Sequence, residues 1–262
     1  MKAPGTQLLD RAIAILDAVA NGNEDGVTLT ELVEATGLSV PTCHRILASL
    51  LAHGLLQRAS KGKRYRLGPK MMVYGVKVAR GPGLRSLAGV CLDRLREVTG
   101  ETALLMVRDD LNSVCIDRRN SAYYIETLTG RIGGSVPLGV GPGSLAMLAF
   151  FDAEEREAII AANAERYRAF VNVDETLVRE RCRETREMGF SLDKGELING
   201  VAGVAYPVRD MEGRVIASLG ITFLSANVAD ELVASYQVLL KEAALSLQPQ
   251  LNPLHGMGLR WS

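Results

Sequence analysis

Basic side chains gather in the N-terminal part of the chain, and no acidic residue lies between Ala35 and Leu92. Residues 1–80 hold 11 Lys and Arg against 6 Asp and Glu, whereas the remaining residues hold 19 against 24. The 262 residues together are neutral, with 30 basic and 30 acidic side chains. A basic head on an acidic body is typical of a polyanion-binding module joined to a second module. The alternative, a solvated charged face, is disfavoured by the complete absence of acids.

The apolar pattern places this basic stretch on three helices. Apolar residues at three- and four-residue spacing predict a first helix over residues 7–20. A second helix begins after a threonine cap at Thr28 or Thr30, and Ser39 caps a third helix over Val40–His53. Two short helices joined by a tight turn form a helix-turn-helix unit, in which the second of the two reads base edges in the major groove.

A β-hairpin follows the third helix. Leu55–Ala59 and Arg64–Leu67 predict two strands joined by a cationic tip at Ser60–Lys63. Such a wing suits phosphates or the minor groove. The residues expected to contact double-stranded DNA are Thr28, Ser39, Val40, Pro41, Thr42, His44, Arg45, Lys61, Lys63, Arg64 and Arg66. For Arg45 the alternative is a solvated surface arginine, and for the wing lysines it is a solvated loop.

Cysteine and histidine spacing excludes a zinc site. The four cysteines form no CxxC pair, and the three histidines are widely scattered. We therefore expect the cysteines to be small buried side chains in a protein of a reducing compartment. No apolar run approaches the roughly 20 residues that a membrane span needs. We expect a cytoplasmic protein with no metal, no cofactor and no membrane segment.

One glycine-rich loop in the second module could hold an anion. Gly139–Ser144 precedes a predicted helix, where backbone N–H groups can cradle an anionic group. The loop lacks the lysine of a nucleotide-binding loop, and a tight turn into a helix is the alternative. The sequence has no HExxH, GxSxG or P-loop motif, and residues 84–248 hold no histidine for a Ser-His mechanism. An enzyme that uses this loop stays an alternative only.

The pattern of the second module predicts sequential hairpins flanked by helices. A connector helix over 69–80 leads to a helix over 84–99, and a long helix over 227–247 closes the module. Three further helices are expected over 143–151, 153–163 and 174–189. The expected strands are Glu101–Val107, Ser113–Asp117, Tyr123–Thr129, Phe190–Asp193, Gly203–Val208 and Val215–Thr222. This order predicts an α+β domain rather than a βαβ layout.

The head resembles the IclR family of bacterial transcriptional regulators. The resemblance is carried by residues 9–16 (LDRAIAIL), 29–38 (LTELVEATGL), 42–47 (TCHRIL) and 65–68 (YRLG). Members often have a Lys-Ser pair before the Thr of the recognition helix, where this chain has Val40 and Pro41. This departure suggests a distinct operator sequence.

The resemblance continues through the body and spans roughly residues 6–247. It is carried there by residues 136–138 with 146–149, 193–200, 204–208 and 219–222. It implies a winged helix-turn-helix domain over 1–68, a connector helix over 69–83 and a GAF-like effector-binding domain over 84–248. A flexible tail is expected over 249–262.

What the resemblance implies about function is a repressor whose operator affinity is set by a small organic acid. It implies a homodimer or homotetramer on a pseudo-palindromic operator. The implied effector-binding residues are Gly139, Ser144, Asp193, Glu196, Gly203, Ala205, Gly220 and Thr222. Members often have larger or more polar residues at 139, 144 and 203, so we expect room for an aromatic acid. For Asp193 and Glu196 a solvated loop is the alternative, and for the whole protein it is a sequence-neutral architectural DNA binder.

Overall fold

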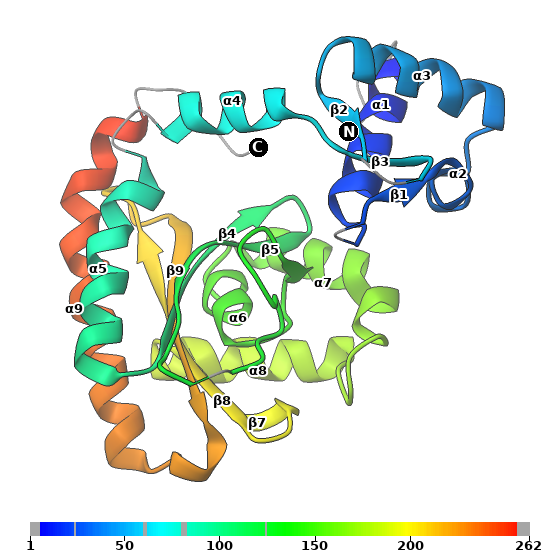
Figure 1. Cartoon of the computed structure of the whole chain (residues 1–262). Coiled ribbons are helices and arrows are strands. Elements are labelled where there is room, and N and C mark those ends of the chain that lie inside the picture. Colours follow the sequence, from blue (N-terminus) through cyan, green and yellow to red (C-terminus); the bar gives the residue numbers. More distant parts are fainter. Residues whose placement is uncertain (1–5, 24, 60–61, 80–82, 124, 256–262) are drawn as a thin grey trace. The chain divides into compact units, whose positions relative to one another are not determined.

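The computed structural model describes residues 6–23, 25–59, 62–79, 83–123 and 125–255. The chain divides into two compact units, with the boundary after residue 81. The first unit contains α1–α4 and β1–β3, and the second contains α5–α9 and β4–β9 (Figure 1). An α+β architecture with an N-terminal winged helix-turn-helix is thereby confirmed.

The helices of the first unit match the prediction closely. They are α1 (Gln7–Ala20), α2 (Leu29–Thr36) and α3 (Val40–Ala52). Thr28 and Glu31 form a capping box at the start of α2: the Thr28 hydroxyl accepts from the Glu31 N–H at 3.3 Å, and the Glu31 carboxylate accepts from the Thr28 N–H at 2.6 Å. Gly37 ends α2 with a φ of 67°, a left-handed conformation that favours glycine.

The wing is a three-stranded sheet with the order β1-β3-β2. Its strands are β1 (Val27–Thr28), β2 (Leu56–Arg58) and β3 (Arg64–Leu67). The two wing strands were predicted, whereas β1 was not, because two residues give no alternation pattern. The buried core beneath the helices and the wing includes Ile15, Leu32, Ile46, Leu47, Leu56 and Tyr65. The expected connector helix is α4 (Pro69–Ala79).

The second unit is built on one antiparallel sheet with the order β6-β5-β4-β9-β8-β7. The strands are β4 (Thr102–Asp109), β5 (Asn112–Arg119), β6 (Ser135–Pro137), β7 (Ser191–Ile198), β8 (Val201–Arg209) and β9 (Val215–Leu224). A short 3-10 helix, η1 (Ser225–Asn227), follows β9. Antiparallel pairing throughout the sheet agrees with the predicted hairpin order.

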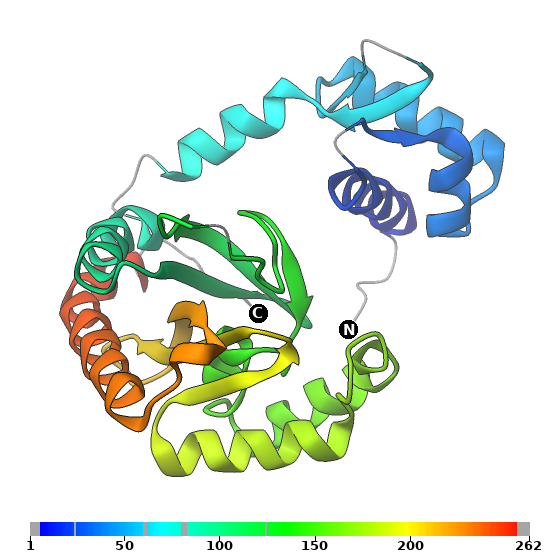
Figure 2. The same cartoon turned by 60° about the horizontal axis from the view of Figure 1, so that its bottom comes forward.

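Helices cover both faces of this sheet. α5 (Leu84–Thr99) and α9 (Asp230–His255) lie side by side on one face (Figures 1 and 2). α6 (Pro142–Leu148) packs on the other face, with α7 (Ala153–Tyr167) and α8 (Glu175–Met188) behind it. Side chains alternate accordingly: Leu105 and Leu219 enter the core under α5 and α9, whereas Leu104 and Met106 enter the core under α6.

The predicted strand Tyr123–Thr129 is wrong. Its described residues form an irregular segment between β5 and β6, although their β-branched and aromatic composition resembles that of a strand. The backbone folds locally instead, because the Gly130 N–H donates to the Thr127 carbonyl at 2.8 Å. The strand that completes this edge of the sheet is the short β6, which pairs with residues 112–114.

The last helix is longer than predicted. α9 continues to His255 rather than ending at Leu247, so residues 249–255 are helical and the expected flexible tail is wrong for them. Leu251 is buried beside Leu247 and extends the apolar stripe of the helix. Pro249 lies within the helix although it cannot donate a backbone hydrogen bond there. Residues 256–262 lie outside the described residues.

The capping box makes Thr28 a stability residue of the first unit. We expect Thr28→Ala to destabilise this unit by about 1 kcal/mol, because the substitution removes an acceptor for an otherwise unpaired N–H. Thr28→Ser keeps the hydroxyl and should retain most of the stability. Urea unfolding followed by circular dichroism measures both variants, and equal losses in the two would contradict the capping role.

Candidate functional site

The first half of α3 presents an exposed face. The predicted contact residues that are exposed here are Ser39, Val40, Pro41, His44 and Arg45. Thr42 is half-buried, and its hydroxyl lies 2.9 Å from that of Ser39, which stands at the N-cap position without capping a backbone N–H. The opposite face of the helix is fixed in the core by Cys43, Ile46, Leu47 and Leu50. This is the orientation that a recognition helix needs, with its N-terminal side chains directed outward.

The wing adds cations to the surface of the first unit. Lys63 and Arg66 are exposed, and Lys61 lies outside the described residues. Arg64 is engaged within the unit: its guanidinium donates to the Gly26 carbonyl at 2.7 Å and pairs with a carboxylate of α2 at 3.4 Å. Arg58, absent from the predicted contact set, is an exposed cation 5.7 Å from the ring of Tyr65. Arg64 and Thr28 therefore shape the unit, whereas Arg58, Lys63 and Arg66 are exposed cations that can meet a polyanion.

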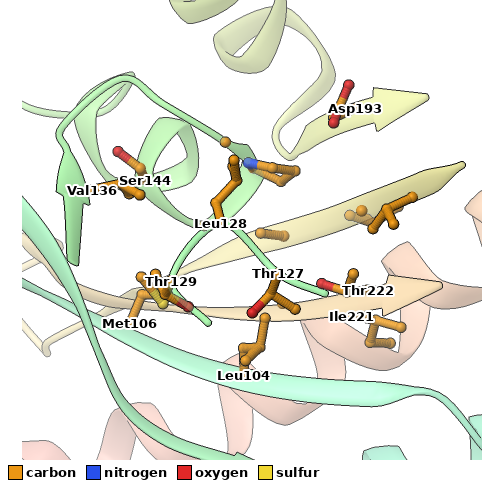
Figure 3. A pocket seen from close by; sticks show the side chains of 18 of the residues that line it. Leu104, Met106, Thr127, Leu128, Thr129, Val136, Ser144, Asp193, Ile221 and Thr222 are labelled. Carbon is orange, nitrogen blue, oxygen red and sulfur yellow. The ribbon is translucent and has the colours of Figure 1, made fainter. Parts of the chain in front are cut away.

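The second unit contains a cavity of about 70 Å³ on the α6 face of the sheet (Figure 3). Six of the eight predicted effector residues line it: Ser144, Asp193, Gly203, Ala205, Gly220 and Thr222. The sequence did not identify the other side chains of the wall, which include Leu104, Met106, Thr127, Leu128, Thr129 and Val136. Among the described lining residues there is one carboxylate, Asp193, and no Lys, Arg or His.

The pairing register of the sheet brings the predicted residues together. Thr222 on β9 pairs with Gly203 on β8, and Gly203 pairs with Asp193 on β7. In the next row, Gly220 pairs with Ala205 on one side and with Leu104 on the other. Directly paired residues point to the same face of a sheet, so residues far apart in the chain share one wall.

The irregular segment between β5 and β6 closes the cavity from the other side. Thr127, Leu128 and Thr129 line it, and Figure 3 shows the three side chains beside those of the sheet. Leu128 packs so close to the α6 loop that a Cβ on Gly141 would lie 2.5 Å from its Cδ1. The composition of this segment predicted a strand, so no sequence signal identified these three residues as part of a pocket.

Serine hydroxyls hold the first turn of α6 against the sheet. Ser191 Oγ on β7 donates to the Pro142 carbonyl and Ser218 Oγ on β9 donates to the Gly143 carbonyl, both at 2.6 Å. Ser144 Oγ accepts from the Gly139 N–H at 2.7 Å and donates to the Pro137 carbonyl at 3.2 Å. These bonds fix the glycine-rich loop, and the N–H groups at the start of a helix have no intrahelical partner.

Asp193 is the one carboxylate among the described residues of the wall. Burial raises the pKa of its carboxyl above the ordinary value. The hydrogen bonds that Asp193 Oδ1 accepts from the N–H groups of Glu196 at 2.9 Å and Gly195 at 3.3 Å only partly offset this effect. Asp193 lies on β7 rather than in a loop, and its side chain is half-buried.

Gly139 and Glu196, the other two predicted residues, line a second cavity of about 310 Å³ between β7 and α8, and Asp193 lines both cavities. The Glu196 carboxylate pairs there with the guanidinium of Arg181. Gly139 has a φ of 106°, and a Cβ on it would lie 2.7 Å from Val178 Cγ1 and 2.8 Å from Tyr167 Oη. Glycine at 139 thus permits close packing and a left-handed backbone.

The small residues do not all leave free volume. A Cβ on Gly203 would lie 3.1 Å from Pro142 Cγ, so the proline ring already fills the space beside this glycine. A Cβ on Gly220 would make ordinary contacts at 3.5 Å. An aromatic ring needs a larger space, since an apolar cavity of about 150 Å³ accommodates benzene. The missing side-chain volume is therefore no argument for an aromatic acid.

Two buried thiols, those of Cys115 and Cys182, have raised pKa values. Burial raises the pKa of the Cys115 thiol above its usual range, and it raises that of Cys182 to about 12. Both thiols are therefore protonated at neutral pH. Among the described residues no three His, Cys, Asp or Glu side chains gather in a way that could hold a metal ion. No helix in the described part of the chain is long and apolar enough to cross a membrane.

Comparison with known protein families identifies both units. Residues 76–248 match the family described as bacterial transcriptional regulator IclR C-terminal, and residues 8–60 match the IclR helix-turn-helix domain. The chain belongs to the IclR family. Its members are DNA-binding transcriptional regulators, so the winged helix and the cavity belong to a regulator with an effector-binding domain.

Curated relatives support the family along nearly the whole chain. The HTH-type transcriptional regulator XynR of Escherichia coli is 30% identical over 95% of this chain and 98% of its own length. BhcR of Paracoccus denitrificans is 28% identical over 98% of this chain and 91% of its own. The Escherichia coli transcriptional repressor IclR is 25% identical over 92% of this chain and 90% of its own.

Solved structures show the same fold. An IclR regulator from Alicyclobacillus acidocaldarius has a TM-score of 0.79 at 24% identity and covers 95% of this chain and 99% of that one. An IclR homologue from Microbacterium hydrocarbonoxydans, solved as a complex with 4-hydroxybenzoate, has a TM-score of 0.74 at 23% identity and covers 94% and 99%.

The packing around Gly139 makes it a structural residue. We expect Gly139→Ala to destabilise the second unit by about 3 kcal/mol, because backbone strain and overpacking each cost about 1–3 kcal/mol. Gly213, with a φ of 81° and nothing within 4 Å of an added Cβ, is the matched control. Gly213→Ala should cost only the strain, about 1 kcal/mol. Calorimetric unfolding of both variants measures the difference, and similar losses would contradict close packing at Gly139.

Proposed function

We propose that this regulator is a repressor that binds a pseudo-palindromic operator as a homo-oligomer and changes its operator affinity when a small organic acid occupies the cavity. The observation that carries the proposal is the pairing of an exposed, acid-free recognition face with a built cavity in one chain of the IclR family. Bound to DNA, such a repressor works in the cytoplasm.

The electrostatics of the first unit support specific DNA binding. Arg45 and His44 lie exposed on α3, and Lys63 and Arg66 lie exposed on the wing. Side chains at the start of a recognition helix read base edges, whereas wing cations neutralise phosphates. If an oligomer neutralises about 6–10 phosphates, its affinity should fall roughly 10³–10⁵-fold between 50 and 200 mM salt.

Apolar side chains on the surface of the first unit support self-association. Leu8 and Leu9 of α1 are 62% and 58% exposed, and Met72 of α4 is 74% exposed beside Val73 and Tyr74. Exposed apolar clusters of this kind mark protein–protein contacts. A second copy that covers them would place two recognition helices on two half-sites, which matches the symmetry of a pseudo-palindrome.

The cavity supports a small effector rather than a cofactor. Thr127, Thr129, Thr222 and Asp193 supply polar side chains to a wall that is otherwise mostly apolar. Its volume of about 70 Å³ suits a short acid better than an aromatic one. Because a structural neighbour was solved as a complex with 4-hydroxybenzoate, aromatic acids are tested as well. An effector with different affinities for two arrangements of the chain typically couples the sites by about 1–3 kcal/mol.

Arg45 is expected to read bases. Arg45→Ala should weaken operator binding by about 1–3 kcal/mol and relax its sequence preference, because a bidentate base contact is lost. Arg66→Ala should weaken binding to operator and random duplexes alike and reduce the salt slope by about 1. Arg94, exposed on α5 of the second unit, is the control.

Fluorescence anisotropy with DNA from upstream of this protein's own gene and with a random duplex measures these effects, and the stoichiometry of the same titration tests the oligomer. If Arg45→Ala weakens binding to both duplexes equally, Arg45 contacts phosphates rather than bases. Equal affinity of the wild type for both duplexes would favour an architectural DNA binder.

The effector class is tested on operator-bound protein. Short aliphatic acids such as pyruvate and aromatic acids such as 4-hydroxybenzoate are added to the complex, and one class should change the operator affinity about 5–150-fold. Binding in a cavity of this volume predicts that the short acids act at lower concentration. Stronger action of benzoate-sized acids would mean that the cavity opens to accept a ring.

A further inference from the structure

The cavity poses an electrostatic problem for an acid. Its described lining contains the carboxylate of Asp193 and no cationic side chain. A second negative charge in a partly buried site raises the free energy of both charges unless a cation or strong hydrogen-bond donors lie nearby. The donor side chains in the wall are hydroxyls. A positive charge that stabilises a bound acid must therefore come from a residue just outside the wall.

The pairing register of the sheet places one cationic side chain, that of Arg118, just outside the wall. Arg118 on β5 pairs directly with Leu104 on β4, and Leu104 pairs with Gly220 on β9. Leu104 lines the cavity, and paired residues point to the same face. A bulge between Leu105 and Met106 sets this register, since Leu105 pairs with Asp117 whereas Met106 pairs with Cys115. Arg118 therefore shares the α6 face of the sheet with the wall of the cavity.

Arg118 differs from the next residue in its partners. Arg119, on the opposite face, forms ion pairs with Asp93 and Asp117 at 2.5 and 2.8 Å. Arg118 has no carboxylate within ion-pair distance in the described part of the chain, and its buried Nε has no hydrogen-bond partner there. The half-buried side chain of Arg118 therefore carries a positive charge that no described carboxylate pairs with.

The guanidinium of Arg118 instead holds the segment that closes the cavity. Arg118 Nη1 donates to the Gly130 carbonyl at 2.7 Å and to Thr127 Oγ1 at 3.4 Å. Thr127 is 8% exposed and lines the cavity. Since its hydroxyl oxygen accepts a hydrogen bond from a cation, the hydroxyl proton turns away from Arg118 and is polarised toward donation.

We propose that Arg118, acting through the Thr127 hydroxyl, makes this cavity select an anionic effector over its uncharged analogue. Arg118 is a positioning residue: it orients Thr127 through the hydrogen bond that it donates to the threonine hydroxyl. Thr127 is the group that donates to the ligand. The inference rests on the proposed effector function and deepens it, because it names the charge of the ligand and the residues that read it.

The test compares acids with their amides. Calorimetric titration of the full chain uses pyruvate and 4-hydroxybenzoate, each beside the corresponding amide, and proceeds with the acid that binds the wild type more tightly. Arg118→Gln and Thr127→Val should each weaken binding of that acid about tenfold, because a charge-assisted donor is lost. Arg118→Gln should leave the weaker binding of the amide unchanged, whereas Thr127→Val should weaken it less than it weakens the acid, because the amide carbonyl accepts from the same hydroxyl. Arg118→Lys keeps the charge and should restore part of the acid affinity.

Arg131→Gln is the matched control, since Arg131 is an exposed arginine on the same segment, and it should change neither affinity. Equal losses for acid and amide in Arg118→Gln would show a structural role alone and overturn the inference, as would unchanged acid binding. If an acid shifts the operator affinity of the wild type, the proposed function stands whatever the variants do. If neither acid binds the wild type, the inference and the proposed effector class fail together, whereas operator binding still decides the DNA-binding role.

Discussion

β9 pairs with β4 on one side and with β8 on the other, and this double register decides where each wall residue of the cavity lies. Thr222, Gly203 and Asp193 form one row across three strands, and Leu104, Gly220 and Ala205 form the next. A slip of one residue would turn both rows to the face covered by α5 and α9. The register in turn is enforced by the two apolar cores, since Leu219 and Ile221 are buried on the opposite face.

The cavity exists because α6 is tethered to this sheet by polar bonds rather than by close apolar packing alone. Ser191 and Ser218 are fully buried, and their hydroxyls bond the carbonyls of the first turn of α6. Short serine side chains hold that turn close to the strands. The glycines at 203 and 220 add no side chain to the strand surface beneath it. The space between is closed by the segment that Arg118 holds. Hydrogen bonds thus fix both the start of α6 and the closing segment around the cavity.

Regular, amphipathic elements could be predicted from the sequence. The helices of the first unit followed from apolar periodicity and from the threonine and glycine at their ends, and the glycine at 37 has the left-handed backbone that its position implies. The end of α9 was missed because Pro249 signals a stop, whereas buried Leu251 continues the apolar stripe. Residues 123–129 were missed because strand-like side chains do not reveal that a turn at Thr127–Gly130 and an arginine from β5 satisfy the backbone.

The candidate site was predictable to the extent that it lies on strands. Asp193, Gly203 and Thr222 were placed together through the resemblance, and pairing explains their proximity. Thr127 and Arg118 carry no motif, because their roles depend on a closing segment and a bulge that only the fold defines. Gly139 and Glu196 were placed with the others but line the second cavity beside α8, since Gly139 turns its backbone toward Val178 and Tyr167.

The central claim is that the effector lies between the first turn of α6, the sheet and the closing segment. A crystal structure of the chain with the acid that most strongly shifts operator affinity tests it most directly. The account predicts density for the acid within hydrogen-bond distance of Thr127 or Thr222, on the wall that includes Gly203 and Gly220. Density in the cavity between β7 and α8, beside Arg181 and Val171, would contradict it.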